Sequence, residues 1–361
     1  MSGFTITAGV SFSGGFTFTE APVENTAAWF GGGSPGYRST VQRITFATDT
    51  DTASVRGPLS RSSTYLAAAG NTTDGWFGGG GLPPVSTVDR ITYATDTDTA
   101  SVRGPLSFAR AYLDAAGNTT DGWFGGGYFF STVNRITYAT DTATASVRGP
   151  LSVSRYHSAA TGNTTDGWFG GGYTSPSVSS TVNRITYATD TDTASVRGPL
   201  SGARAYLAAT GNTYDGWFAA GYVSGSGGRS TVDRITYATD TATASVRGLL
   251  SLNRRYLAGA GNTTDGWAGG GYSGPAYADS STVQRITYAT DTATAVVRGP
   301  LSSNRANLAA SGNTTEAWFG GGVGLVSIVN RITFATDTNT ASVRGPLSVA
   351  RSSLAAAGGI Q

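Results

Sequence analysis

The stretch that decides the fold lies in the second copy of a repeated pattern: YLAAAGNTTDGWFGGG (residues 65–80) and STVDRITYATDTDTASVRGPLS (residues 86–107). It holds four strand-like runs, called strands a to d, over residues 65–69, 76–80, 87–94 and 99–104. Strand a is alanine-rich, strand b aromatic and glycine-rich, and strands c and d are rich in Thr, Val, Ile and Tyr, residues that favour strands over helices. Gly104-Pro105 ends strand d, because proline cannot donate a ladder hydrogen bond. No helix is expected.

The pattern recurs seven times with a period of about 45–50 residues, which is typical of the four-stranded blades of a β-propeller. Its marker in strand b is a tryptophan, and these seven are all the tryptophans of the chain: Trp29, Trp76, Trp123, Trp168, Trp217, Trp267 and Trp318. The arginine of strand c is Arg43, Arg90, Arg135, Arg184, Arg234, Arg285 or Arg331. The arginine of strand d is Arg56, Arg103, Arg148, Arg197, Arg247, Arg298 or Arg344.

The two ends of the repeat array complement each other. The first copy starts at Ala28-Trp29 without a strand a, and the chain finishes on residues 353–358, a strand a without its strand b. We therefore expect the C-terminal strand to complete the first blade, which removes exposed sheet edges. The predicted fold is all-β: a seven-bladed β-propeller of four-stranded antiparallel blades over residues 28–361.

Composition narrows the function. The net charge is +2 and no lysine occurs, so no broad basic surface for nucleic acid is expected. Cysteine is absent, which excludes disulfides and thiolate metal sites. The N-terminus lacks the features of a secretion signal, and no apolar run approaches the ~20 residues of a membrane helix, so we expect no membrane insertion.

Residues 155–160 (RYHSAA) followed by 168–172 (WFGGG) resemble a kelch repeat. The resemblance covers about residues 28–358 and departs in strand d, where Val-Arg-Gly replaces the usual tryptophan. The near-verbatim phrase ATDTATASVRGPLS resembles propeller proteins of marine bacteriophages, particularly cyanophages. That resemblance implies a virion protein of fibre, spike or decoration type, assembled in the host cytoplasm.

Residues 1–27 differ from the repeats. Phe4–Thr7 and Phe16–Thr19 alternate apolar and polar residues around Ser13-Gly14-Gly15, which favours a hairpin or two extended pieces. A lone hairpin is marginal in water. We expect this arm to attach the propeller to other virion proteins or to sister subunits in a homo-oligomer. The alternative is a partly ordered tail.

The loops between strands b and c vary most between copies. In a four-stranded blade they share one face with the connections between blades, and variable aromatic loops on a rigid scaffold favour binding. The alternative is drift in unconstrained loops. The candidate ligand-binding residues are Tyr37, Tyr128, Phe129, Phe130, Tyr173, Tyr222, Tyr272 and Tyr277.

The opposite face is expected to carry uniform turns rich in Asp, Asn and Thr. Such residues usually cap the local backbone, and we expect the strand arginines to bridge blades by pairing with the aspartates. Calcium would also accept these oxygens, but Asp-Thr-Asp occurs only in some copies. No metal site and no cofactor is predicted.

An enzyme is not expected. The copper chemistry of galactose oxidase, a kelch-type propeller, needs cysteine and several histidines, and this chain has no cysteine and one histidine, His157. A Ser/His/Asp triad could use only His157, whose repeat equivalents we take to be Leu66, Leu113 and Leu207. A sialidase or another glycosidase needs a distinctive set of acids, whereas the arginines and tyrosines recur symmetrically.

The sequence therefore predicts a non-enzymatic virion propeller that binds a host-surface glycan or protein through its variable loops. One alternative is a decoration protein without a receptor. A second is a cellular kelch-like adaptor.

Overall fold

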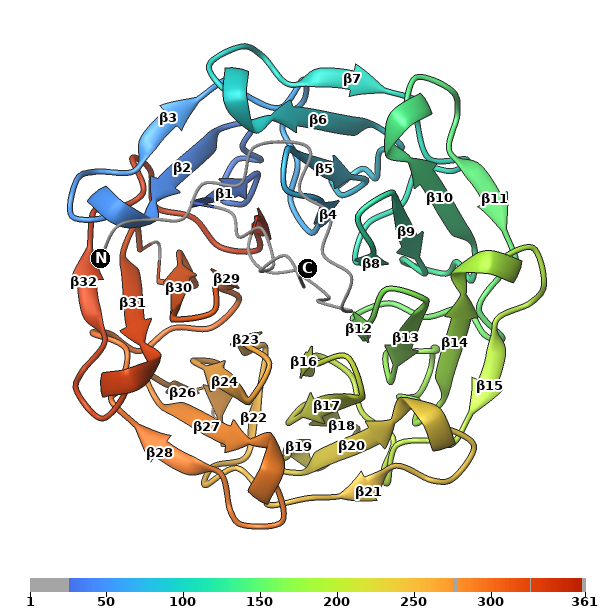
Figure 1. Ribbon diagram of the computed structural model, residues 1–361, viewed down its shortest axis with the longest axis vertical. Coiled ribbons are helices and arrows are strands. Elements are labelled where there is room, and N and C mark those ends of the chain that lie inside the picture. Colours follow the sequence, from blue (N-terminus) through green and yellow to red (C-terminus); the bar gives the residue numbers. More distant parts are fainter. Residues whose placement is uncertain (1–25, 275–277, 325, 359–361) are drawn as a thin grey trace, which may run out of the picture.

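The computed structural model describes residues 26–274, 278–324 and 326–358. Figure 1 shows sheets set radially around a central axis, and seven of the sheets in the described residues have four antiparallel strands. The predicted seven-bladed β-propeller is confirmed.

The strands of each class occupy the same radial position in every blade (Figure 1). The a strands, innermost, are β33 (Ala355–Ala357), β4 (Ala67–Gly70), β8 (Asp114–Gly117), β12 (Ala159–Gly162), β16 (Ala208–Gly211), β23 (Ala258–Gly261) and β29 (Ala309–Gly312). The b strands are β1 (Ala27–Gly31), β5 (Asp74–Gly78), β9 (Asp121–Gly125), β13 (Asp166–Gly170), β17 (Asp215–Ala219), β24 (Asp265–Gly269) and β30 (Glu316–Gly320). The c strands are β2 (Val41–Thr45), β6 (Val88–Thr92), β10 (Val133–Thr137), β14 (Val182–Thr186), β20 (Val232–Thr236), β27 (Val283–Thr287) and β31 (Val329–Thr333). The outer d strands are β3 (Ser54–Arg56), β7 (Ser101–Arg103), β11 (Ser146–Arg148), β15 (Ser195–Arg197), β21 (Ser245–Val246), β28 (Val296–Arg298) and β32 (Ser342–Arg344).

The first blade closes as predicted. Strand β33 pairs antiparallel with β1, with Ala356 opposite Phe30, and the sheet order is β3-β2-β1-β33. Strand β1 begins at Ala27, so this residue belongs to the propeller and not to the expected arm of residues 1–27. Thr26 is described, and the remaining residues of that arm, 1–25, lie outside the described residues.

Strands a, c and d are shorter than expected, whereas strand b keeps five residues but lies two residues earlier, at Asp74–Gly78 in the second blade. Strand c of the second blade stops at Thr92 and not at Ala94, because the chain then turns into a single 3-10 turn. All seven blades have this turn, which the sequence did not predict: η1 (Phe46–Thr48), η2 (Tyr93–Thr95), η3 (Tyr138–Thr140), η4 (Tyr187–Thr189), η5 (Tyr237–Thr239), η6 (Tyr288–Thr290) and η7 (Phe334–Thr336). The turn places an aromatic ring against the neighbouring blade.

Each tryptophan is a contact between blades. Trp29 of blade 1 stacks on Tyr93 of blade 2 with ring centroids 3.7 Å apart, a geometry worth about 1 kcal/mol beyond the buried area. Its Nε1–H donates to Asp96 Oδ2 at 2.7 Å. The same stack and hydrogen bond recur around the ring, and Trp318 of blade 7 donates to Asp49 of blade 1 at 2.8 Å.

The two strand arginines complete this contact. Arg43 and Arg56 reach Asp96 at 3.1 and 3.4 Å, and the aspartate is only 4% exposed. The pattern repeats in every blade pair, so the predicted pairing of strand arginines with turn aspartates across blades is confirmed. We call the unit of one Trp, two Arg and the next blade's Asp the inter-blade clasp.

Two glycine positions of the repeat permit this close packing. A Cβ at Gly78 would lie 2.9 Å from the ring of Phe124 in the next blade, and one at Gly104 would lie 1.5 Å from the carbonyl oxygen of Ala143. A larger residue at either position would force the neighbouring blades apart unless the contact also changed. Blade 5 shows such a change, with Ala219 at the position of Gly78 and Ala268 of the next blade at the position of Phe124.

Candidate functional site

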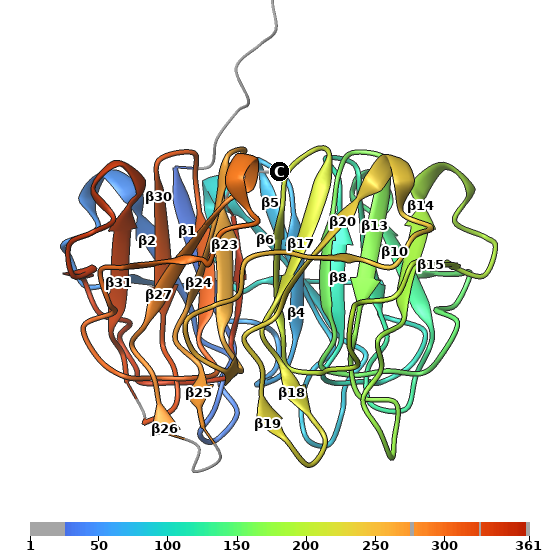
Figure 2. The ribbon, with the colours of Figure 1, turned by 90° about the horizontal axis from the view of Figure 1, so that it is seen from below.

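The b–c loops gather on one face of the ring, and the 3-10 turns lie on the opposite face (Figure 2). We call the first the variable-loop face. Short extra strands extend it in blades 5 and 6: β18 (Tyr222–Val223), β19 (Gly227–Gly228), β22 (Arg254–Arg255), β25 (Tyr272–Ser273) and β26 (Ala278–Asp279).

The structure brings five of the eight candidate residues into one aromatic network. Tyr128 and Phe129 are 42% and 59% exposed and contact each other, with ring centroids 4.0 Å apart. Tyr173, Tyr222 and Tyr272 each lie within about 6 Å of a tyrosine from an inter-blade connection.

The other three candidates have no described ring contact with this network. Phe130 packs instead on Phe108, at 5.7 Å. Tyr37 is exposed in the loop of blade 1 without a ring contact among those described. Tyr277 lies outside the described residues.

The inner part of the network was not predicted. Just before each a strand, one residue adopts a left-handed conformation with φ between 53° and 61°. These seven residues, the axial ring, are Tyr65, Tyr112, His157, Tyr206, Tyr256, Asn307 and Ser353.

The axial ring is closed by backbone hydrogen bonds. The N–H of each member donates to the carbonyl oxygen of the member in the preceding blade, from Tyr112 to Tyr65 onward, and Tyr65 donates to Ser353, all at 2.9–3.2 Å. Left-handed backbone costs a non-glycine residue about 1–2 kcal/mol, and the cyclic hydrogen bonding offsets that cost at every position.

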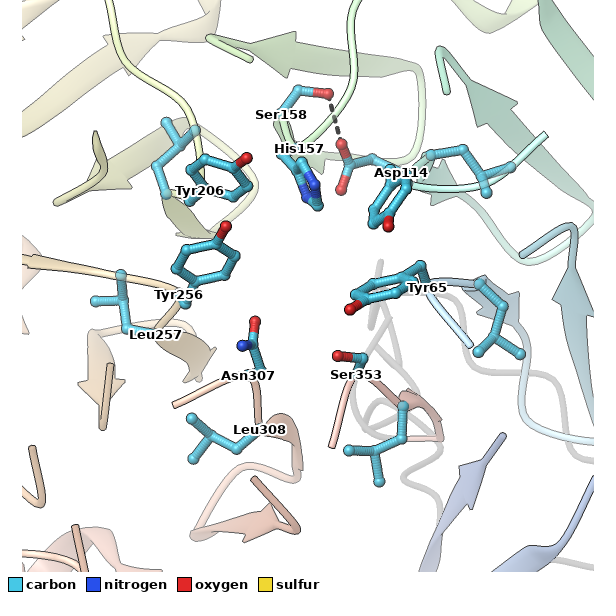
Figure 3. Close-up of a pocket in the computed structure, with 15 residues that line it drawn as sticks. Tyr65, Asp114, His157, Ser158, Tyr206, Tyr256, Leu257, Asn307, Leu308 and Ser353 are labelled. Carbon is cyan, nitrogen blue, oxygen red and sulfur yellow. Dashed lines mark hydrogen bonds between the residues drawn. The ribbon is translucent and has the colours of Figure 1, made fainter. Parts of the chain in front are cut away.

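Five neighbouring side chains of the axial ring form a continuous aromatic arc. Ring centroids lie 4.2 Å apart for Tyr65 and Tyr112, and 4.4 Å for Tyr112 and His157. The arc continues at 4.2 Å to Tyr206 and 4.1 Å to Tyr256. It ends at Asn307 and Ser353, so the opening is aromatic on one side and polar on the other (Figure 3).

Behind this ring lies a cavity of about 240 Å³ at the axis, here called the axial cavity. Most of its second layer is leucine, but Ser158 occupies the leucine position of blade 4, and Asp114 stands where the other six blades have alanine. The Ser158 hydroxyl donates to the Asp114 carboxylate (Figure 3).

The expected alignment of His157 was wrong by one residue. Its φ of 53° and its backbone bond to Tyr112 place it in the axial ring, and Ser158 is the residue equivalent to Leu66 and Leu113. Because Ser158 donates to Asp114, its hydroxyl is not oriented by His157 as a Ser/His/Asp triad requires.

Burial sets the protonation of the cavity's titratable groups. Desolvation raises the pKa of Asp114 to about 7, and the Ser158 hydrogen bond and the charge of Arg155 oppose it to a smaller degree. Desolvation lowers the pKa of His157 to about 3, so this imidazole is neutral at neutral pH. Burial, with the neighbouring Tyr65, raises the pKa of Tyr112 to about 12, so its hydroxyl stays protonated.

A third set of arginines fixes the b–c loops to the blades. Arg155 is fully buried and donates to the carbonyl oxygens of Phe169, Gly171 and Thr181 at 3.2, 3.1 and 2.8 Å. Equivalent buried arginines are Arg110, Arg204, Arg254, Arg305 and Arg351. Blade 2 has Ser63 at this position. These arginines give the variable loops rigid ends.

The opposite face is uniform and carries both ends of the described chain. The Thr26 carbonyl accepts from the N–H of Phe46 in a 3-10 turn, and the Gly358 carbonyl accepts from Ser311 at 3.0 Å. The clasps engage the aspartates of the c–d turns. Among the described residues, no cluster of three His, Asp or Glu side chains is placed to hold a metal ion.

Comparison with known proteins gives the fold. No family model and no curated protein matches the chain. The solved structure of YjhT, a kelch-repeat β-propeller protein, is similar, with a TM-score of 0.61 and 12% identity over 78% of this chain and 99% of YjhT. The fold is therefore a kelch-like β-propeller. No helix in the described part of the chain has the length and apolarity to cross a membrane.

The missed residues left a signal in the sequence. Tyrosine recurs at one position of four copies, at Tyr65, Tyr112, Tyr206 and Tyr256, but alignment alone does not show that it converges on an axis. Asp114 is the only charged residue within the alanine-rich a strands. This departure from the repeat was a signal in the sequence that blade 3 differs at this position.

Proposed function

We propose that this chain is a non-enzymatic recognition protein of a virion, which displays its variable-loop face to a host-surface glycan or protein. The observation that supports this most is the separation of the two faces. Four of the five exposed aromatic side chains among the described residues belong to the variable-loop face and its inter-blade connections: Tyr37, Phe108, Tyr128 and Phe129. The fifth, Tyr214, lies on the other face, from which both ends of the described chain leave (Figure 2).

This arrangement suits display. The described chain begins at Thr26, on the face away from the aromatic loops, so attachment to other virion proteins through residues 1–25 would leave those loops free. The proposal that the protein belongs to a phage particle rests on the resemblance of its repeat to propeller proteins of marine bacteriophages. Tyrosine-rich rigid loops support recognition, because tyrosine offers a large contact area at a low cost in conformational entropy.

Binding of the purified protein to host envelopes and glycan arrays tests the proposal. Replacing Tyr128-Phe129-Phe130 by Ser-Gly-Ser should abolish binding and leave folding intact, because Phe129 has a φ of 67° that glycine adopts readily. The matched control is Tyr214→Thr. It removes an aromatic residue that is 74% exposed on the opposite face and restores the residue of the other copies.

Four results would contradict parts of the proposal. Equal loss of binding in both variants would remove the link to the variable-loop face. No binding by the wild-type protein would favour a decoration protein without a receptor. Incorporation into particles after deletion of residues 1–25 would refute attachment through that segment, and absence from particles altogether would favour the cellular adaptor.

A further inference from the structure

The strongest break in the sevenfold symmetry lies in the axial cavity. In blade 3, Asp114 occupies a position where every other blade has alanine. Its hydrogen-bond partner Ser158 belongs to blade 4 and occupies a position where the other blades have leucine. The fold does not need this pair, because six blades pack without it. A carboxylate placed where burial opposes its charge is typical of a functional site.

We propose that the axial cavity binds an amino sugar, with Asp114 as the counter-ion of its protonated amine and the axial ring as its hydrogen-bonding wall. This deepens the function proposed above and rests on it, since it names the chemistry that the centre of the variable-loop face would recognise.

The negative charge of Asp114 favours a ligand with a protonated amine. Among the described residues that line the cavity, Asp114 is the only acidic side chain, none is an arginine, and His157 is neutral. The charge of Arg155 acts on Asp114, but Arg155 donates its hydrogen bonds to carbonyl oxygens within its own blade. A ligand ammonium group would place a second positive charge in direct contact with the Asp114 carboxylate and form charge-assisted hydrogen bonds.

The wall selects a hydroxyl-bearing ligand over a simple alkyl amine. Neighbouring rings of the arc lie 4.1–4.4 Å apart, one pair stacked and the other three tilted by 37–56°, so the wall offers ring edges and hydroxyl groups to a ligand. Figure 3 shows the Tyr65 hydroxyl and the Asn307 amide directed toward the middle of the cavity, with the Ser353 hydroxyl at its edge. These groups donate to and accept from sugar hydroxyls.

The size of the cavity limits the ligand. Its volume of about 240 Å³ lies below the ~300–1,000 Å³ of sites for drug-sized molecules. It therefore accommodates one sugar unit, such as the terminal residue of a chain whose remainder lies over the loops.

Calorimetric titration with D-glucosamine tests this, with D-glucose and N-acetylglucosamine as neutral counterparts and methylammonium as an amine without hydroxyls. We expect saturable binding of glucosamine alone. Asp114→Ala, which restores the residue of the other blades, should weaken it by roughly tenfold or more, the loss expected for a hydrogen bond to a charged group. The control Asp98→Ala removes an exposed carboxylate on the opposite face and also restores the alanine of other copies.

Each outcome of these titrations supports or refutes the amino-sugar site. Unchanged affinity in Asp114→Ala, equal binding of glucose, or no binding of glucosamine would overturn the assignment. If methylammonium binds as tightly as glucosamine, the site recognises only an amine, and the proposal that it recognises a sugar is refuted. Envelope binding that persists without glucosamine binding would overturn only this inference. The reverse result would overturn only the host-recognition role.

Discussion

Asp89 of blade 2 lacks the buried arginine that contacts the equivalent residue in the other blades. Asp89 is 4% exposed. Its Oδ2 accepts from the Ser60 N–H at 3.2 Å, whereas Oδ1 is buried without a hydrogen-bond partner among the described residues. In blade 5 the equivalent Asp233 pairs with Arg204 at 2.9 Å. Blade 2 has Ser63 in place of that arginine.

Asp89→Asn should therefore stabilise the protein. In blade 3 the amide of the equivalent Asn134 donates to the Ala145 carbonyl at 3.2 Å, and the new side-chain amide in blade 2 would reach the Ala100 carbonyl in the same way. One new hydrogen bond is worth about 1 kcal/mol, and removal of an unpaired buried charge adds about 1 kcal/mol or more. We expect the free energy of unfolding at pH 7 to rise by about 2 kcal/mol.

The equivalent substitution in blade 5 should lower the free energy of unfolding. Asp233→Asn leaves Arg204 with a hydrogen bond of the kind that Arg110 makes to Asn134 at 2.8 Å, but removes the buried countercharge. Loss of one partner of a buried ion pair costs about 3–5 kcal/mol, and the retained hydrogen bond reduces this to about 2 kcal/mol.

Urea unfolding of the three proteins from pH 3 to 8 is the assay. Burial raises the pKa of Asp89 in the folded state, so the folded state binds its proton more tightly, and wild-type stability falls as pH rises from about 4. The gain from Asp89→Asn should therefore shrink toward pH 3. A destabilised Asp89→Asn at pH 7, or a gain that does not depend on pH, would refute the reasoning.

Three further predictions follow from the clasp, the axial ring and the axial cavity. Asp141→Ala removes the acceptor of Trp76 at 2.7 Å and of two arginines, so urea unfolding should show a loss of about 3 kcal/mol; a loss below about 1 kcal/mol contradicts the clasp. Ser353→Gly should raise the free energy of unfolding by up to about 1 kcal/mol, because φ is 55° there, and Ser353→Val should lower it. Because the folded-state pKa of Asp114 is raised to about 7, ionisation destabilises the fold as pH rises from about 4 to 7. Asp114→Ala should therefore raise Tm more at pH 8 than at pH 5, and an equal change at both would contradict it.

The sequence by itself determined the number of blades, their strand order and the closure by the C-terminal strand, expected within residues 353–358. The reason is physical: the marker residues of the strands recur in seven copies, and a blade can bury its tryptophan only against the next blade. The pairing of strand arginines with turn aspartates was also predictable, since buried charges require partners.

Only the tertiary structure decided what lies at the axis. Tyr65 and Ser353 belong to the first and last connections between blades, yet a backbone hydrogen bond joins them, because ring closure brings the two ends of the repeat array together. The left-handed φ of His157, and hence its place beside tyrosines and not leucines, depends on that same cyclic hydrogen bonding. The contact between Asp114 and Ser158 likewise exists only because adjacent blades converge at the axis, where two substitutions in different repeats become one site.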